Sequence, residues 1–168
     1  MKEKPQFLGD VAVRGIQEMH VAYLRHIGPY AGKGDLFQRL TGRLIAWAGP
    51  RGLACFPEAK LLRVYYDDPH ITDSSKLRID VCLTVPKGTA ADGEIGSMTI
   101  SGGRCAVGHF EIFPEQFPDA YDAIYGEWMR QSGYQPDDRP CYEVSLNDPS
   151  RNPEGKHVVE ICVPVKPL

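Results

Sequence analysis

The strongest constraint on the fold is that the second half of the sequence repeats the first. The matched segments, which lie 80 residues apart, are VYYDDP at 64–69 with VSLNDP at 144–149, and IDVCLTV at 79–85 with VEICVPV at 159–165. A shift of 81 residues also places Trp47 on Trp128. Because the matches keep the same order and nearly the same register, we interpret the chain as a duplicated unit.

The residue pattern in each half of the sequence predicts the order strand, helix, strand, strand. Apolar residues at helical spacing before Gly49 and Pro50 indicate the first helix, and β-favouring segments bounded by turn residues indicate the strands. The expected strands are 21–24, 62–66, 77–85, 104–112, 141–146 and 158–165, and the expected helices are 35–48 and 118–131. We also expect a strand at 11–17 and a linker at 87–97, between repeats at about 10–86 and 98–168.

The predicted fold class is α+β, with a mainly antiparallel sheet and one helix in each half. A chain of 168 residues has the usual size of one domain, and one half alone offers too little apolar surface for a core of its own. Duplication also implies a pseudo-twofold axis. We therefore expect a single domain with a ligand cleft at the seam of its two repeats.

Composition excludes several functional classes. A net charge of −3 gives no general field that would attract nucleic acid. The longest apolar runs are far shorter than the roughly 20 residues of a membrane helix, and the start MKEKP lacks a signal core. We expect a cytoplasmic protein without direct contact to nucleic acid or membrane.

The five cysteines predict neither disulfides nor a metal site. Their number is odd, and the sequence has no C-x-x-C and no paired Cys/His spacing typical of zinc. Walker loops, dinucleotide fingerprints, G-x-S-x-G and H-E-x-x-H are also missing from the sequence. We expect free, mostly buried thiols, no metal and no cofactor.

Acidic residues on predicted strands are the first candidates for a site. Alternation places Asp80 and Cys82 on one strand face, and Glu160 is placed in the same way in the second half. If the register allows, the last two strands bring Glu143 and Glu160 into one region, where an acid needs a donor or a wet cleft. The structural alternative for Asp80 is an ion pair with Arg78 on the rim of the sheet.

Aromatic residues and histidines leave a similar choice. Trp47 and Trp128 lie on the apolar stripes of their helices, which favours a core role over a ligand platform. Tyr66 is the tyrosine that we expect to reach the cleft. His26 and His109 occupy near-equivalent positions in the two halves, and a structural role for both is more common than catalysis.

Several segments resemble a known family. They are VYYDDP at 64–69, KLRID at 76–80, ISGG at 100–103, PCYEV at 140–144 and VPV at 163–165. From about 21 to 167 the chain is similar to the GyrI-like small-molecule-binding domain, and most of all to its stand-alone DNA gyrase inhibitory members. The resemblance implies tandem strand-helix-strand-strand units and a cleft that takes lipophilic, often cationic compounds between a glutamate and aromatic rings.

The resemblance also implies roles for single residues. Glu143 matches the glutamate of the family's C-[FY]-E-V-Y segment, Glu160 matches the acid of its last strand, and Tyr66 matches its Y-D-x-P turn. Ser145 and Cys162 stand where the family often has tyrosine, which implies a roomier cleft filled by ligand, ordered water or the side chains of Tyr142 or Phe110. The expected ligand contacts are Glu143, Glu160, Tyr66, Ser145, Cys162, Trp128 and Phe110.

Three functions remain open on the sequence. The first is a stand-alone protein that captures a lipophilic, possibly cationic or toxic compound. The second is a hydrolase of electrophilic, cyclopropane-bearing genotoxins, with Glu143 as general base and Tyr66 steadying the leaving oxygen. The third, by family analogy alone, is protection of DNA gyrase by direct contact.

Overall fold

The computed structural model describes residues 11–168, which divide into two compact units. The first unit is Glu18–Ser101, and the second unit joins Gly102–Leu168 to the segment that precedes Glu18. Within each unit every strand pairing is antiparallel, and helical segments pack on one face of the sheet. The α+β prediction is confirmed.

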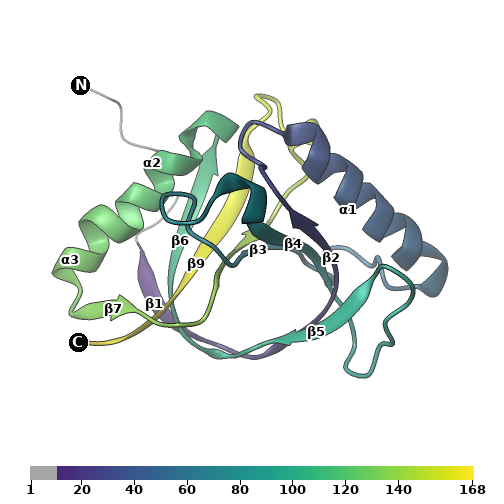
Figure 1. Ribbon diagram of the computed structural model, residues 1–168, viewed down its shortest axis with the longest axis horizontal. Coiled ribbons are helices and arrows are strands. Elements are labelled where there is room, and N and C mark those ends of the chain that lie inside the picture. The colour runs from purple at the N-terminus through teal and green to yellow at the C-terminus, as the bar shows by residue number, and fades with distance from the viewer. Residues whose placement is uncertain (1–10) are drawn as a thin grey trace. The chain divides into compact units, whose positions relative to one another are not determined.

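The first unit is a four-stranded sheet with one long helix. Its elements are β2 (Met19–Ile27), α1 (Gly34–Ala48), η1 (Gly49–Arg51), β3 (Leu61–Tyr65), η2 (Ser74–Lys76), β4 (Arg78–Thr84) and β5 (Gly96–Ile100). The strands pair in the order β3-β4-β2-β5. Figure 1 shows α1 lying along one side of this sheet.

Apolar spacing explains how α1 packs. Leu40, Leu44 and Ala48 recur every four residues, so they lie on one side of the helix, and all three are buried. They pack on a cluster that includes Val81 and Leu83 of β4. Asp80 and Cys82 alternate with these two residues along β4, so they lie on the other face of the sheet.

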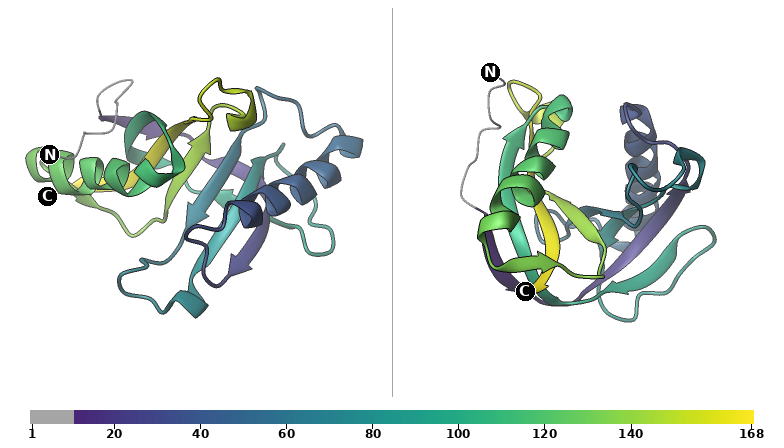
Figure 2. Two further views of the ribbon diagram at one scale, coloured as in Figure 1. Left: turned by 90° about the horizontal axis from the view of Figure 1, so that it is seen from above. Right: turned by 60° about the vertical axis from the view of Figure 1, so that its left-hand side comes forward.

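The second unit has more elements but a related sheet. They are β1 (Ala12–Ile16), β6 (Gly103–Ile112), η3 (Pro114–Gln116), α2 (Phe117–Asp122), η4 (Ala123–Trp128), α3 (Met129–Gln131), β7 (Tyr134–Pro136), β8 (Cys141–Ser145), η5 (Pro149–Arg151) and β9 (His157–Pro167). The strands pair in the order β1-β6-β9-β8, with β7 beside the C-terminal end of β9. In Figure 2, α2, η4 and α3 form one continuous coil over β6 and β9.

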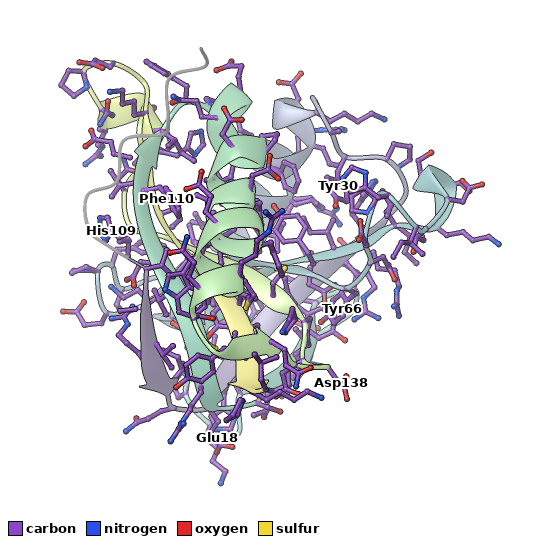
Figure 3. All side chains as sticks on the ribbon, turned by 90° about the vertical axis from the view of Figure 1, so that its left-hand side faces the viewer. Glu18, Tyr30, Tyr66, His109, Phe110 and Asp138 are labelled. Atoms are coloured by element: carbon purple, nitrogen blue, oxygen red, sulfur yellow. The ribbon has the colours of Figure 1, made fainter. Side chains whose placement is uncertain are left out.

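The core of the second unit contains a close contact between the Phe110 ring and Gly108. Phe110 is fully buried and packs with Ile124 and Ile161. A Cβ built on Gly108 would lie 2.6 Å from the Phe110 ring, so that ring occupies the space that a side chain at 108 would need. Figure 3 shows His109, its neighbour on β6, pointing to the other side of the strand. The helical segments thus cover one face only.

The predicted order strand, helix, strand, strand is confirmed in both units. It is formed by β2, α1, β3 and β4 in the first unit and by β6, the coil from 117 to 131, β8 and β9 in the second. The pairing order β3-β4-β2 in one unit corresponds to β8-β9-β6 in the other. This agrees with duplication, while the pseudo-twofold axis stays a prediction.

Three local expectations were wrong. The supposed linker 87–97 contains the start of β5, which pairs with β2. The strand expected at 11–17 exists as β1, but it pairs with β6 and so joins the second unit rather than the first. The three-residue strand β7 was not expected. Residue 10, where we expected the first repeat to begin, lies outside the described residues.

Between residues 11 and 168 no helix combines the length and the apolar character that crossing a membrane requires.

Candidate functional site

A nearly buried glutamate marks the candidate site. Glu143 lies in the middle of β8 and is only 4% exposed. The register pairs it with Ile161 of β9, a core residue, so Glu143 points to the face that the helical segments cover. There the hydroxyl of Tyr121 on α2 donates a hydrogen bond of 2.6 Å to Oε2 of Glu143.

Two further aromatic rings lie one turn before and one turn after Tyr121 on the same coil. Tyr125 stacks on Tyr121 with ring centroids 6.4 Å apart and planes within 14°, and 39% of Tyr125 is exposed. Phe117, one turn before Tyr121, meets the His157 ring edge-on at 5.8 Å. The site therefore combines an acid in an apolar setting with a stacked pair of phenol rings, one of which reaches the surface.

The coil that carries these tyrosines has an unusual backbone. Residues 123–128 form a π-helix, which makes i→i+5 rather than i→i+4 hydrogen bonds. Tyr121 precedes this segment and Tyr125 lies within it. Single turns of π-helix occur often at functional sites. Their coincidence with the stacked tyrosines is a second reason to place the site here.

The expectation that Glu143 and Glu160 share one region was wrong. Glu160 lies opposite Val144 and His109 in the register, so its side chain points to the face away from the helical segments. It forms an ion pair with Arg14 of β1. A one-residue offset between β8 and β9 thus places the two glutamates on opposite faces of the sheet.

The expectation that Ser145 and Cys162 line one cleft was wrong for the same reason. Ser145 lies opposite Val159, on the face of Glu143, and its hydroxyl donates to the main-chain oxygen of Asn147 at 3.0 Å. Cys162 lies on the other face, opposite Tyr142, and is 3% exposed. Burial raises the pKa of the Cys162 thiol to about 12, with the nearby Cys105 and Glu160 adding to the shift.

The suggested ion pair between Asp80 and Arg78 was wrong. Asp80 is fully buried and receives two hydrogen bonds from Arg25, its cross-strand partner, at 2.9 and 3.0 Å. Arg78 pairs with Asp67 instead. Residues 78 and 80 lie on one strand, whereas Arg25 faces Asp80 directly across the β2–β4 ladder. Asp80 is therefore a buried structural partner rather than a rim residue.

Tyr66 also belongs to this structural network. Its hydroxyl donates to Oδ2 of Asp80 at 2.7 Å, and its ring lies 5.2 Å from the Arg25 guanidinium. Burial raises the pKa of Tyr66 well above its usual value, and the hydrogen bond to Asp80 raises it further. The tyrosine that donates to Glu143 is Tyr121, which was not among the ligand contacts expected from the sequence.

Trp128 and Phe110 lie with the core of the second unit. Trp128 packs against the buried cluster and stacks on Tyr134 with centroids 6.1 Å apart, which agrees with the core role that its spacing favoured. Phe110 is fully buried in the same cluster. Direct contact of either residue with a ligand stays a prediction.

A shallow hollow of about 460 Å³ in the first unit is a weaker candidate. It lies between α1 and the turn before β5, beside Trp47. Its charges are already paired, because Arg43 binds Glu94 and Arg51 binds Asp92. Across residues 11–168 no three His, Cys, Asp or Glu side chains are grouped so as to hold a metal ion.

Comparison with known proteins places the chain in a family. Residues 10–166 match the GyrI-like small molecule binding domain. The chain belongs to this family. It is 36% identical over 148 residues to DNA gyrase inhibitor 2 of Dickeya dadantii, covering 86% of this chain and 87% of the relative. It is 30% identical over 161 residues to the DNA gyrase inhibitor of Edwardsiella piscicida, covering 93% and 97%.

Solved structures with a similar fold are more distant in sequence. The C-terminal domain of EcmrR aligns with a TM-score of 0.72 at 18% identity, over 96% of this chain and 99% of that one. A hydrolase from Listeria innocua aligns at 0.64 and 15%, over 96% and 93%. SAV2435 bound to tetraphenylphosphonium aligns at 0.62 and 12%, over 94% of both chains. These likenesses support the α+β fold.

Proposed function

The chain carries a GyrI-like small-molecule-binding domain, and we propose that it captures lipophilic cations at Glu143. The observation that carries the proposal is the Glu143 carboxyl group, which is 4% exposed and accepts a hydrogen bond from Tyr121, whose ring stacks on the exposed ring of Tyr125. A charge in such an apolar setting interacts strongly with an opposite charge because little water screens it.

The stacked tyrosines supply the second half of the recognition. A cation held against a phenol face gains about 0.5 to 2 kcal/mol per good contact. Aromatic substituents on the ligand add apolar burial against the same rings. The preferred compound therefore carries a delocalised or shielded positive charge among aryl or alkyl groups, as tetraphenylphosphonium does in its complex with SAV2435.

Calorimetry with a panel of hydrophobic cations tests this function. Glu143→Gln keeps the size of the side chain and removes its charge, and we expect it to weaken cation binding by about tenfold or more. Glu160→Gln is the matched control, because Glu160 lies on the opposite face of the same sheet. Equal affinities in both variants and the parent would remove Glu143 from the binding site.

A second candidate function is hydrolysis at the same glutamate. The fold likeness to a Listeria hydrolase and the Glu143–Tyr121 pair support it. Glu143 would take a proton from water, the hydroxide would bond to a cyclopropane carbon, and the broken ring bond's electron pair would pass to an adjacent carbonyl oxygen, which Tyr121 could steady until a proton arrives. A product heavier than the substrate by one water, formed by the parent and lost in Glu143→Gln, would establish turnover.

The names of the curated relatives support a gyrase partner as a third candidate. Two of them, at 36% and 30% identity, are called DNA gyrase inhibitors. A gyrase supercoiling assay at micromolar protein, with and without a gyrase toxin, tests this role. Unchanged supercoiling under both conditions would retire it.

A further inference from the structure

We propose that the first unit holds a site for aromatic or amphipathic carboxylates, built around Arg63. Its position is informative, because the 80-residue repeat that aligns Val64 with Val144 places Arg63 where the second unit has Glu143. Equivalent positions of the two repeats therefore carry a positive charge at Arg63 and an acid at Glu143. The first suits an anionic ligand and the second suits a cationic one.

Arg63 points to the helix-covered face of its sheet. It lies opposite Val81, a residue of the core cluster under α1, in the β3–β4 register. Its guanidinium carbon lies 4.6 Å from the centre of the Phe37 ring on α1. The side chain is only partly accessible, which makes the placement a packed one rather than a free surface chain.

The guanidinium is a charge without a counter-ion. The other two arginines in the strands of the first unit, Arg25 and Arg78, each form an ion pair with a carboxylate. Among residues 11–168, Arg63 has neither an ion-pair partner nor a hydrogen-bond partner. One face of the guanidinium rests on Phe37 and its N–H groups remain as donors. That planar fork matches a carboxylate, which accepts two parallel hydrogen bonds.

Rings beside Arg63 supply the apolar part of the site. Tyr30 lies 6.2 Å from Phe37 in an edge-on arrangement and 5.7 Å from Tyr65, measured between ring centroids. Tyr65 shares the strand face of Arg63, two residues along β3. All three rings are half-buried, and Figure 3 shows where Tyr30 lies. A carboxylate on Arg63 would extend its apolar body over these rings.

This chemistry distinguishes the site from the one at Glu143. An arginine on an aromatic ring attracts anions and repels the cations that a buried glutamate selects. The ligand class is therefore a monocarboxylate with an aromatic or long apolar body. The proposal does not depend on cation binding in the second unit.

The test compares two probes with the same rings, 2-naphthoate and the uncharged 2-naphthylmethanol, by calorimetry at pH 7. We expect the parent protein to bind the carboxylate about tenfold or more tightly than the alcohol, because hydrogen bonds to charged groups are stronger than those between neutral groups. Arg63→Gln should reduce this ratio to within about twofold, and Arg63→Lys should restore part of it. Arg39→Gln, an exposed arginine of α1 outside the cluster, should leave the ratio unchanged.

Two results would overturn the proposal. One is a parent protein that does not prefer the carboxylate, and the other is an Arg63→Gln variant that folds normally and keeps the preference. Glu143→Gln separates the two sites: it should leave the naphthoate ratio intact, and a loss as large as that of Arg63→Gln would contradict a site carried by the first unit. Cation binding measured on Arg63→Gln then tests the function at Glu143 independently.

Discussion

The hydroxyl of Tyr121 lies 2.6 Å from Oε2 of Glu143 and donates to it. This hydrogen bond joins the coil to the sheet within the second unit, and it holds an acid in an apolar setting at a fixed orientation. Since Tyr125 continues the ring surface from Tyr121 toward solvent, the acid and the aromatic wall belong to one arrangement.

Tyr121→Phe should weaken cation binding less than Glu143→Gln does. The substitution keeps the ring and its stacking on Tyr125 but removes the donor that orients the carboxyl group. We expect a loss of about threefold to tenfold in affinity, which corresponds to one hydrogen bond of ordinary net strength. Calorimetry with tetraphenylphosphonium measures it, and an unchanged affinity would show that the carboxyl group needs no orientation by Tyr121.

Replacing Asp80, the buried acid of the first unit, should lower the stability of the protein. Asp80 is fully buried and accepts hydrogen bonds from Arg25 and Tyr66, so Asp80→Ala leaves both donors without their partner. We expect the free energy of unfolding to fall by about 3 to 5 kcal/mol. Urea denaturation measures the loss, and Asp92→Ala is the control. Asp92 forms an exposed pair with Arg51, which should contribute about 1 kcal/mol or less.

Two glycine substitutions should have opposite effects. A Cβ at Gly108 would meet the Phe110 ring at 2.6 Å and Ile124 at 3.2 Å, so Gly108→Ala should cost about 1 to 3 kcal/mol of stability. A Cβ at Gly42, in the exposed middle of α1, would meet nothing within 4 Å, so Gly42→Ala should stabilise by up to about 1 kcal/mol. Thermal denaturation of the pair checks both signs, and a neutral Gly108→Ala would contradict the packing described.

The thiols should differ sharply in reactivity. Burial raises the pKa of Cys162 to about 12, so at pH 8 this thiol is protonated and shielded, whereas Cys55 is exposed. Iodoacetamide at pH 8 should therefore modify Cys55 first, with Cys162 protected until the protein unfolds. Peptide mass spectrometry follows the order. Because the folded pKa lies above that of the unfolded chain, Cys162 also lowers stability as the pH rises above about 9.

The fold was largely predictable because the spacing of apolar residues along the sequence defines the helices and strands of both repeats. Stripes such as Leu40 and Leu44 define α1 whatever surrounds them, and the turn at 67–69 ends β3 by local chemistry. The start of β5 was missed because Gly96 looks like linker. The ring of Tyr23 covers Gly96 so closely that a Cβ there would lie 2.5 Å from it, a contact that spacing along the chain does not reveal.

The candidate site was only partly predictable for a different reason. Glu143 was identified from its motif. Whether it lies on the same face of the sheet as Glu160 depends on the register between β8 and β9, because a shift of one residue moves every side chain of a strand to the opposite face. Its partner Tyr121 lies 22 residues away on a helix. Tyr121 was visible as one of several aromatic residues at helical spacing, and nothing in that spacing singled it out from Tyr125 or Trp128.

Selection of positive charge by Glu143 is tested most directly by the ratio of the affinities for a cation and for an uncharged compound of similar shape. Methyltriphenylphosphonium and the uncharged triphenylphosphine oxide present similar aryl groups and differ in charge. Calorimetry should show that the parent binds the cation about tenfold or more tightly than the oxide, and that Glu143→Gln brings the two affinities together by weakening cation binding alone. A folded Glu143→Gln protein that keeps the full preference for the cation would contradict the account.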